Sequence, residues 1–280
     1  MISGILEAVS GYCKSNRIVF CRLNIPCPDN LFISLAPSMP PLHTLGNRVW
    51  TYWNSPRPIA RVPLTGGTED IIARMHRKAR RNYRRSQECG VRVVRSSATA
   101  LPAVARLMQG MGHRKQVLVR GEDHLRTLFN LYPAEDVALF VAEIAGEPAA
   151  FNFAICFARV VWVLYGCLDY EKRDVFPMEP VDVETLLWAH QKGCKECDLG
   201  GTCTSWPPKQ TDKGYGVWHY KKNLGATAVL MAPYCDLVSI PPLYRAAMLA
   251  ESAMLPLVLE RGWGKVRVGL EGLRRELRWH

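Results

Sequence analysis

A dense run of basic residues from His76 to Arg85 carries the strongest chemical signal in the sequence. Glu88 is the only acidic residue among this run and the arginines at positions 92 and 95. Like charges one helical turn apart repel each other, which a solvated helix face tolerates and a bound polyanion relieves. The side chains expected to face outward and to hold phosphates are Arg77, Arg81, Arg84 and Arg85.

Two glycine-containing segments further along the chain could approach a ligand closely. Residues 197–201 (Cys-Asp-Leu-Gly-Gly) are expected at the end of a strand, where paired glycines permit a tight turn and a close approach of the backbone to a ligand. A structural turn capped by Asp198 would explain the same residues. Residues 214–226 place Tyr220, Lys221 and Lys222 near the end of a predicted helix, where lysines commonly interact with the helix dipole. Each segment therefore has a functional and a structural interpretation.

Cysteine and histidine residues do not form a convincing metal site in the sequence. Cys194 and Cys197 have the spacing of a ligand pair, with Cys203 nearby and His190 one turn earlier. A structural zinc site uses four ligands, commonly as two pairs, and the second pair is missing. The ten cysteines are scattered, and several adjoin apolar runs, so we expect reduced and buried thiols and no metal.

Hydrophobic periodicity places these motifs on helices and strands. The basic run lies on a helix predicted at 68–89, with Thr68 as N-cap and Gly90 as stop signal. Three β-rich runs within 136–166 predict an antiparallel meander. The other expected strands are 17–23, 31–35, 48–53, 91–94, 196–199 and 226–230, and the other expected helices are 98–109, 123–131, 181–192, 215–223 and 242–262.

This order of elements is that of an N-acetyltransferase-like (GNAT) domain, an α+β arrangement with a mixed sheet and flanking helices. We predict that residues 96–232 form this catalytic domain. Residues 1–95, which include the basic helix 68–89, and residues 233–280 are predicted to form a smaller, truncated second domain.

Composition favours a globular protein with an anionic partner. The 280 residues include 36 Lys+Arg against 25 Asp+Glu, a formal net charge of +11. RNA, a nucleotide-bearing substrate and an acidic membrane surface all match that sign. No stretch approaches the roughly 20 apolar residues that a membrane-spanning helix needs. We therefore expect no stable membrane insertion and a cytoplasmic location.

Taken together, the motifs resemble the Fem family of tRNA-dependent aminoacyl (peptidyl) transferases, known for building peptidoglycan cross-bridges. The resemblance rests on the order of five features within residues 71–232: a basic helix followed by Gly-Val-Arg-Val, a strand ending in Leu-Tyr-Gly, a helix after Pro180, the Asp-Leu-Gly-Gly turn, and an aromatic-lysine pair before Leu-Gly. It implies the same N-acetyltransferase-like fold.

The resemblance also implies a site around Lys221. By the family pattern Lys221 is the catalytic lysine, and Tyr220 stands where the family has phenylalanine and forms an aromatic wall. When an amine attacks the ester that joins an amino acid to tRNA, negative charge develops on the carbonyl oxygen, and a fixed ammonium would stabilise it. The implied substrate-binding residues are Tyr165, Asp198, Gly200, Gly201, Tyr220 and Lys222.

Aminoacyl-tRNA is the co-substrate that the resemblance implies, with no further cofactor, and the basic helix would hold tRNA phosphates. The amino acid would pass to the α-amino group of a peptide acceptor. The chain is shorter at its N-terminal end than typical members, where the resemblance places much of the acceptor site. The acceptor therefore stays open between a peptidoglycan precursor and an antibiotic peptide or peptidyl-nucleotide, as in pacidamycin-like biosynthesis. The amino acid transferred and the oligomeric state also stay open.

Two other functions share part of these features. An acyl-CoA-dependent N-acetyltransferase would use the same scaffold, but it needs a Gln/Arg-x-x-Gly-x-Gly/Ala loop that binds pyrophosphate at a helix N-terminus. Residues 169–180 stand at that place and lack the pattern. A non-catalytic RNA-binding protein would explain the basic helix and leave the Asp-Leu-Gly-Gly and Tyr-Lys segments without a purpose.

Overall fold

The computed structural model describes residues 2–23, 28, 42–44, 58–117, 119–203, 205, 207–212, 214–232 and 235–250. Contacts divide the chain into two units. The larger unit is Ser55–Leu230, and the smaller unit combines Met1–Asn54 with Met231–His280. The chemistry-bearing segments all lie in the larger unit.

A seven-stranded mixed sheet forms the centre of the larger unit. Its spatial order is β4 (Arg92–Ser96), β5 (Val137–Ile144), β6 (Glu147–Phe157), β7 (Val160–Leu168), β8 (Glu196–Gly201), β3 (Pro58–Pro63) and β9 (Thr227–Leu230). Neighbouring strands are antiparallel except β7 and β8, which are parallel. The predicted antiparallel meander is confirmed, because β5, β6 and β7 pair in sequence order.

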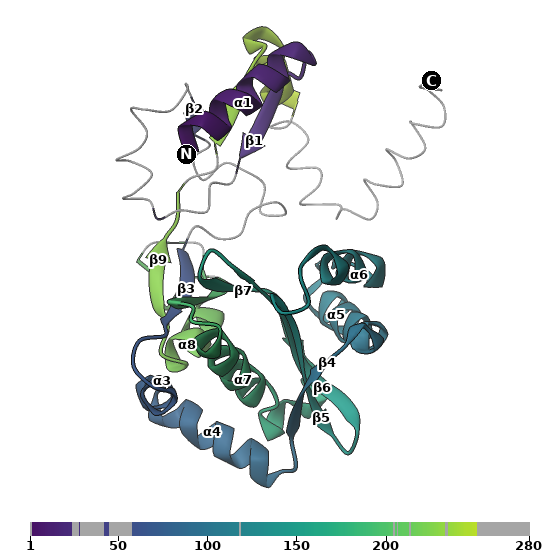
Figure 1. Ribbon diagram of the computed structural model, residues 1–280, viewed down its shortest axis with the longest axis vertical. Helices are drawn as coiled ribbons and strands as arrows, with labels where there is room; N and C mark the ends of the chain where they lie inside the picture. Colours follow the sequence, from purple (N-terminus) through teal and green to yellow (C-terminus); the bar gives the residue numbers. More distant parts are fainter. Residues whose placement is uncertain are drawn as a thin grey trace. The chain divides into compact units, whose positions relative to one another are not determined.

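Helices cover both faces of this sheet (Figure 1). One face carries α5 (Leu101–Lys115), preceded by the 3-10 turn η2 (Ala98–Ala100), and α6 (Glu122–Leu131). The other face carries α3 (Thr68–Arg74), α4 (Arg77–Glu88), α7 (Met178–Gln191) and α8 (Tyr215–Asn223). A further 3-10 turn, η3 (Tyr170–Val175), links β7 to α7. The predicted α+β class, a mixed sheet with flanking helices, is confirmed.

Strand β6 contributes side chains to the cores on both faces of the sheet. Its centre is buried on both sides, so apolar residues point to both faces of the sheet and are interrupted at Asn152. Phe151 and Phe153 pack in the core beneath α5, whereas Ala150 and Ala154 pack in the core beneath α7. The small residues leave room for α7 to lie close to the sheet. Its buried Leu186 and Val181 fill that space.

The basic segment forms two helices where one was predicted. The break falls at Met75 and His76, between α3 and α4. The amide of His76 donates to the carbonyl of Asn223 at the end of α8, at 2.8 Å, and the His76 ring accepts from the amide of Lys78. Gly67, rather than Thr68, caps α3, and its amide donates to Asp70. The break therefore anchors the end of α8, a tertiary contact that helix periodicity does not encode.

The observed division of the chain differs from the predicted boundary at 95/96. Strand β4 pairs with β5, and β3 pairs with both β8 and β9, so residues 58–95 complete the large sheet. The basic helix α4 packs on α7 and belongs to the same unit. The smaller unit contains α1 (Ile2–Ser15), β1 (Phe20–Leu23), β2 (Leu42–Thr44) and β10 (Cys235–Val238). β10 lies between β1 and β2 in its sheet.

Several expected boundaries moved. Helix α1 was not predicted, and α7 begins at Met178 because Pro180 is tolerated in a first helical turn, where no intrahelical amide bond is lost. Residues 241–250 are helical, as predicted, and the rest of the expected helix 242–262 and the expected strands 31–35 and 48–53 lie outside the described residues. Within the described residues, no helix is long and apolar enough to cross a membrane.

Leu186 provides a test of this packing. Its side chain is fully buried between α7 and the sheet, so Leu186→Ala should lower the free energy of unfolding by about 2–5 kcal/mol. Leu131→Ala on α6 is the control, because Leu131 is 68% exposed and its removal should change stability by less than about 0.5 kcal/mol. Urea unfolding followed by circular dichroism measures both. Equal effects of the two substitutions would contradict the described core.

Candidate functional site

Lys221 lies in the last turn of α8 with its amine directed at β8. Its Nζ donates to the carbonyl oxygens of Leu199, at 2.6 Å, and Gly201, at 2.7 Å. The side chain is half-buried. An ammonium carries three N–H donors, so these two bonds leave one donor for another acceptor.

This amine occupies the place where two parallel strands part. The ladder between β7 and β8 ends at the pair Trp162 and Asp198, and beyond it β8 continues to pair with β3 at Gly201. Gly200 has a φ of 79°, in the left-handed region that favours glycine. A Cβ built there would lie 3.9 Å from both Lys221 Nζ and the Val163 carbonyl oxygen. Gly200 thus turns β8 away from β7 with the amine beside the turn.

The glycine pair therefore belongs to the strand itself. Gly200 and Gly201 were predicted as a turn after a strand ending at 199, but β8 extends through Gly201. Their part in the site is through the backbone: Gly200 allows the bend, and Gly201 supplies a carbonyl that accepts from Lys221.

A buried polar network begins at Tyr220, the residue before Lys221 in the same helix. The Tyr220 hydroxyl donates to Asp182 Oδ2 at 2.6 Å. Asn152 Nδ2 donates to Asp182 Oδ1 at 2.8 Å and to the Thr185 hydroxyl oxygen at 3.1 Å. Thr185 in turn donates to the Val181 carbonyl. The network joins α8, α7 and β6.

Gly166 leaves the space that Asn152 needs in this network. The two residues face each other across β6 and β7. A Cβ at position 166 would lie 2.3 Å from Asn152 Oδ1, a separation that real structures do not allow. Packing against Asn152 therefore explains why the Leu-Tyr-Gly motif ends in a glycine.

Burial and the neighbouring polar groups have opposite effects on the pKa values of Lys221 and Asp182. Burial lowers the pKa of Lys221 to about 8, against the opposing effect of Asp182 and Asp198. Burial raises the pKa of Asp182 to about 6, against the hydrogen bonds from Tyr220 and Asn152 and the charge of Lys221. Near neutral pH the lysine is therefore mostly an ammonium and the aspartate mostly a carboxylate.

Asp198 stabilises the bend of β8, because its buried carboxylate is bonded to other groups of the protein. Its carboxylate accepts from the Gly200 amide at 2.7 Å and from Arg61 Nε at 3.3 Å. Arg61 also pairs with Glu196 and lies over the Trp162 ring. Asp198 is buried, so it acts on Lys221 through its charge, which Arg61 partly offsets.

Tyr165 and Lys222 do not join the lysine cluster. Tyr165 lies on the opposite face of the sheet, where it packs against Phe153 and its hydroxyl is 2.9 Å from His124 Nε2. The shift in register between β6 and β7 beside Phe153 turns the alternation of β7, which sequence periodicity does not reveal. Lys222 is exposed, on a different side of α8 from its neighbour.

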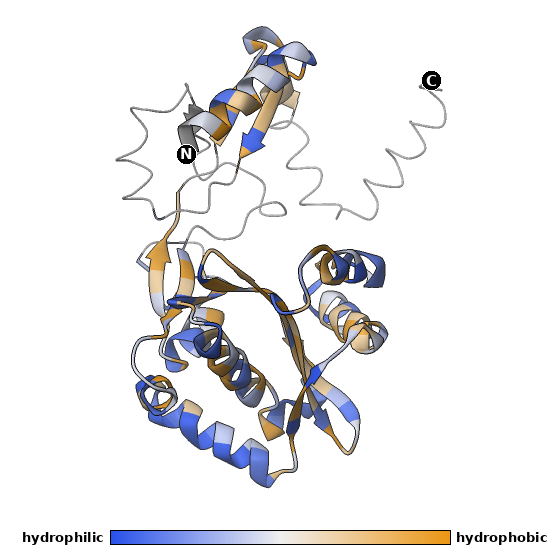
Figure 2. Ribbon diagram, in the orientation of Figure 1, coloured by the Kyte–Doolittle hydropathy of each residue, from blue (hydrophilic) through white to orange (hydrophobic). Residues whose placement is uncertain are grey.

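The four arginines predicted to bind phosphates are exposed on α4. Arg77, Arg81, Arg84 and Arg85 point away from the core, whereas Ala79, Asn82 and Ser86 are buried against it. Arg85 also lies over the Phe176 ring. Figure 2 shows α4 as hydrophilic over most of its length. Arg80, by contrast, donates to the Ala73 carbonyl and so joins α4 to α3.

Three residues of the cluster were missed at the level of sequence. Asp182, Asn152 and Arg61 all lie within segments that read as apolar core. Asp182 carries a usable signal, since an acid between Val181 and Val183 in a buried helix requires a partner. Asn152 gives the same signal in the middle of β6. The partners themselves come from other elements and need the fold.

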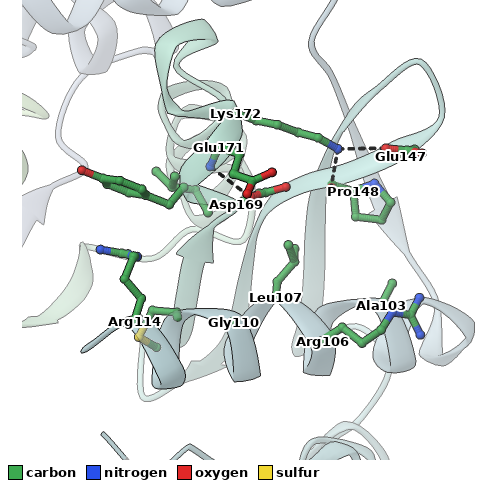
Figure 3. Close-up of a pocket in the computed structure, with 13 residues that line it drawn as sticks. Ala103, Arg106, Leu107, Gly110, Arg114, Glu147, Pro148, Asp169, Glu171 and Lys172 are labelled. Carbon is green, nitrogen blue, oxygen red and sulfur yellow. Dashed lines mark hydrogen bonds and ion pairs between the residues drawn. The ribbon is translucent and has the colours of Figure 1, made fainter. Parts of the chain in front are cut away.

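A separate cavity of about 640 Å³ lies along one side of α5 (Figure 3). It lies between α5, the start of β6 and η3, and none of the predicted site residues line it. Its charged groups cancel: Arg106, Arg114 and Lys172 face Glu147, Asp169 and Glu171. Lys172 is already paired with Glu147, and Arg114 lies over the Tyr170 ring.

The thiols near the strand bend pack among themselves and the core. Cys194 Sγ lies 3.3 Å from Cys156 Sγ, and Cys197 and Cys203 are buried. Burial is the main cause that raises the pKa of Cys194 to about 12. In the part of the chain that the structure describes, no three His, Cys, Asp or Glu side chains gather as metal ligands would.

Comparisons with known proteins agree with this architecture. The sequence family described as an acetyltransferase (GNAT) domain matches residues 73–222. The lipid II:glycine glycyltransferase of Staphylococcus haemolyticus is 30% identical over 84 residues, which are 30% of this chain and 20% of that protein. The match thus spans about a fifth of that relative's length.

Solved structures share the fold at low sequence identity. The crystal structure of FemX superposes with a TM-score of 0.74 at 16% identity, covering 88% of this chain and 78% of FemX. The C-terminal domain of a putative lysylphosphatidylglycerol synthetase from Agrobacterium fabrum gives a TM-score of 0.55 at 12% identity, over 89% of this chain and 77% of that one. Since the family match covers more than half of the residues and includes both α4 and Lys221, the chain belongs to the acetyltransferase (GNAT) domain family, with a Fem-like fold.

Proposed function

We propose that this protein transfers an aminoacyl group from aminoacyl-tRNA to the α-amine of a peptide, forming a peptide bond without a further cofactor. The observation that carries the proposal is the Lys221 ammonium, fixed by two backbone carbonyls at the point where β7 and β8 part. The Fem-like fold and the short match to a glycyltransferase support the same class of reaction.

Lys221 suits the charge that forms in this reaction. When the acceptor amine attacks the ester carbonyl of aminoacyl-tRNA, the carbonyl oxygen becomes negative in the tetrahedral intermediate. The third N–H of Lys221 can donate to that oxygen, while its other two donors hold the amine still. The proton released by the attacking amine passes through the substrate to the leaving ribose hydroxyl. The ester is already activated, so alignment supplies much of the remaining acceleration.

The exposed arginines of α4 supply a surface for the tRNA backbone. Arg77, Arg81, Arg84 and Arg85 all face solvent, and guanidinium groups bind phosphate oxygens through charge-assisted and often bidentate hydrogen bonds. α4 also contacts α8, the helix that carries Lys221. A polyanion on α4 would therefore lie near the helix of the proposed catalytic group.

An acyl-CoA donor fits this chain less well. The segment between β7 and α7 contains no glycine that would let backbone amides surround a pyrophosphate. It folds as the 3-10 turn η3, and Glu179 stands in the first turn of α7, where its charge would repel phosphate. Sequence and local structure thus both favour a different acyl donor.

The acceptor follows from the curated relative as a first choice. The name of that relative, lipid II:glycine glycyltransferase, points to a peptidoglycan precursor, and a small antibiotic peptide or peptidyl-nucleotide is the second acceptor to test. Purified protein is incubated with tRNA charged with single radiolabelled amino acids and each acceptor, and in parallel with acetyl-CoA. Label in a peptide bond supports the proposal, and acetylation of the acceptors from acetyl-CoA alone would overturn it.

Lys221→Ala should lower kcat by about 10²- to 10³-fold, because the intermediate loses its oxyanion donor. tRNA binding, measured by filter retention, should stay close to that of the unchanged protein, since α4 is intact. Full activity of the variant would show that Lys221 has another role even if transfer itself is observed. Lys222→Ala is the matched control, one residue along α8 and exposed.

The rate of transfer should also depend on pH through Lys221. The pKa of Lys221 is about 8, so the charged form is lost as the pH rises through that value, and kcat/KM should fall above it. In Lys221→Arg the guanidinium stays charged, so the remaining activity should show no decline near pH 8. A rise through pH 8 that is equal in both proteins would report deprotonation of the acceptor α-amine, whereas a rise confined to the unchanged protein would indicate that the neutral Lys221 amine acts as a base.

Reversing charge at Arg81 and Arg84 should weaken tRNA binding and flatten its dependence on salt. Each phosphate contact that is lost reduces the slope of log K against log salt by roughly 0.7–0.9. Arg81→Glu/Arg84→Glu is compared with Arg106→Glu/Arg126→Glu, which reverses the same amount of charge at two exposed arginines on α5 and α6, on the opposite face of the sheet. Equal losses in both proteins would mean that net charge, rather than the α4 surface, attracts the RNA.

A further inference from the structure

Asp182 is a buried acid that accepts hydrogen bonds from two neutral donors. It lies in α7 between the fully buried Val181 and the buried Val183, and only 4% of its surface is exposed. A buried carboxylate is costly unless hydrogen bonds and a nearby charge compensate it. Two neutral donors compensate it in part, the Tyr220 hydroxyl and the Asn152 amide. Its charge remains to be balanced by a cation.

Tyr220 connects that acid to the proposed catalytic lysine. It directly precedes Lys221 in α8, and a helix fixes the directions of adjacent side chains relative to each other. Tyr220 anchors α8 to α7 through Asp182, and Lys221 anchors it to β8 through Leu199 and Gly201. α8 is thus held at two neighbouring residues on two different elements.

We propose that Asp182 is a positioning residue for Lys221: held by Tyr220 and Asn152, it fixes the last turns of α8 and supplies the negative charge that keeps the half-buried amine protonated. The inference deepens the proposed function and rests on it for its catalytic meaning. The effect of Asp182 on the pKa of Lys221, however, can be measured without any substrate.

The other charged groups around Lys221 leave Asp182 as the main source of this effect. Asp198 on β8 also favours the ammonium, but Arg61 on β3 is bonded to its carboxylate. Glu179, one turn before Asp182 on α7, is bonded to Asn82 on α4. Of the two carboxylates that act on the lysine, Asp182 is the one held by neutral donors.

Cys197 is a further titratable group beside the two aspartates. Burial raises its pKa well above the usual value, so the thiol stays neutral across the working range. The Tyr220 hydroxyl likewise stays protonated, because burial is the main cause that raises its pKa. Neither group therefore changes charge between pH 6 and pH 9, so neither contributes to the titration of Lys221 in that range.

The test compares Asp182→Asn and Tyr220→Phe with Glu179→Gln as the matched control on the same helix. Removing the carboxylate charge disfavours the ammonium, so the alkaline decline of transfer should move to lower pH. A shift of one pH unit would reduce transfer at pH 8.5 by several-fold, approaching tenfold well above the pKa, with recovery toward pH 6.5. Tyr220→Phe removes a donor to the Asp182 carboxylate and so raises the pKa of Asp182, which should shift the decline in the same direction by a smaller amount. Glu179→Gln should not shift it.

A direct titration separates this inference from the proposed function. Protein labelled with ¹³C at the lysine Cε atoms is titrated by NMR, and the Lys221 signal is assigned by its loss in Lys221→Ala. Lys221 should titrate at lower pH in Asp182→Asn than in the unchanged protein. An unchanged titration overturns the inference, whichever acyl donor the protein uses. A shifted titration without transfer from aminoacyl-tRNA supports the coupling and refutes the proposed function.

Tyr220→Phe keeps the inference testable if Asp182→Asn does not fold, because it removes one hydroxyl and keeps the ring. Two results with Tyr220→Phe would together overturn the proposal: an equal loss of transfer at pH 6.5 and pH 8.5, and an unchanged titration of Lys221. They would show that the network has a structural role only.

Discussion

The hydrogen bonds from the Lys221 amine to two carbonyls of β8 are the constraint on which the rest of the site depends. An ammonium half-removed from water must find oxygen atoms, and Leu199 and Gly201 supply them only because β8 has left β7 at that point. Gly200, with its left-handed backbone, makes that departure possible. A side chain at position 200 would strain the bend, because the backbone there is left-handed, so the position of the Lys221 amine depends on Gly200.

Further hydrogen bonds from the surrounding elements hold the end of α8 that carries Lys221. Tyr220 bonds to Asp182 on α7, and Asn223 at the end of α8 accepts from His76 at the break between α3 and α4. Glu179 on α7 accepts from Asn82 on α4. α7 therefore connects the basic helix and the lysine helix through buried polar contacts. Such contacts fix relative orientation more narrowly than apolar packing does, because a hydrogen bond is lost within a fraction of an ångström.

The same scaffold serves acyl-CoA enzymes, and the differences here lie in local chemistry. Fold similarity at 16% identity establishes the arrangement of sheet and helices, whereas the reaction depends on which side chains stand at the strand bend. Here these are a lysine, a pair of glycines and two buried aspartates. The segment before α7 lacks the glycines that a pyrophosphate-binding loop needs, and the acidic Glu179 lies in the first turn of α7.

Local patterns in the sequence determined the order of elements from β4 to β9, the meander, the exposed arginines of α4 and the position of Lys221 on a helix, because helix and strand periodicities and glycine stops act over a few residues. The tertiary structure alone decided what depends on distant partners. It placed Tyr165 on the far face of the sheet, assigned residues 58–95 to the large unit through β3 and β4, and broke the basic helix at His76. It also brought Asp182 and Asn152 to Tyr220, since a buried polar group shows in sequence that it needs a partner but not which partner it has.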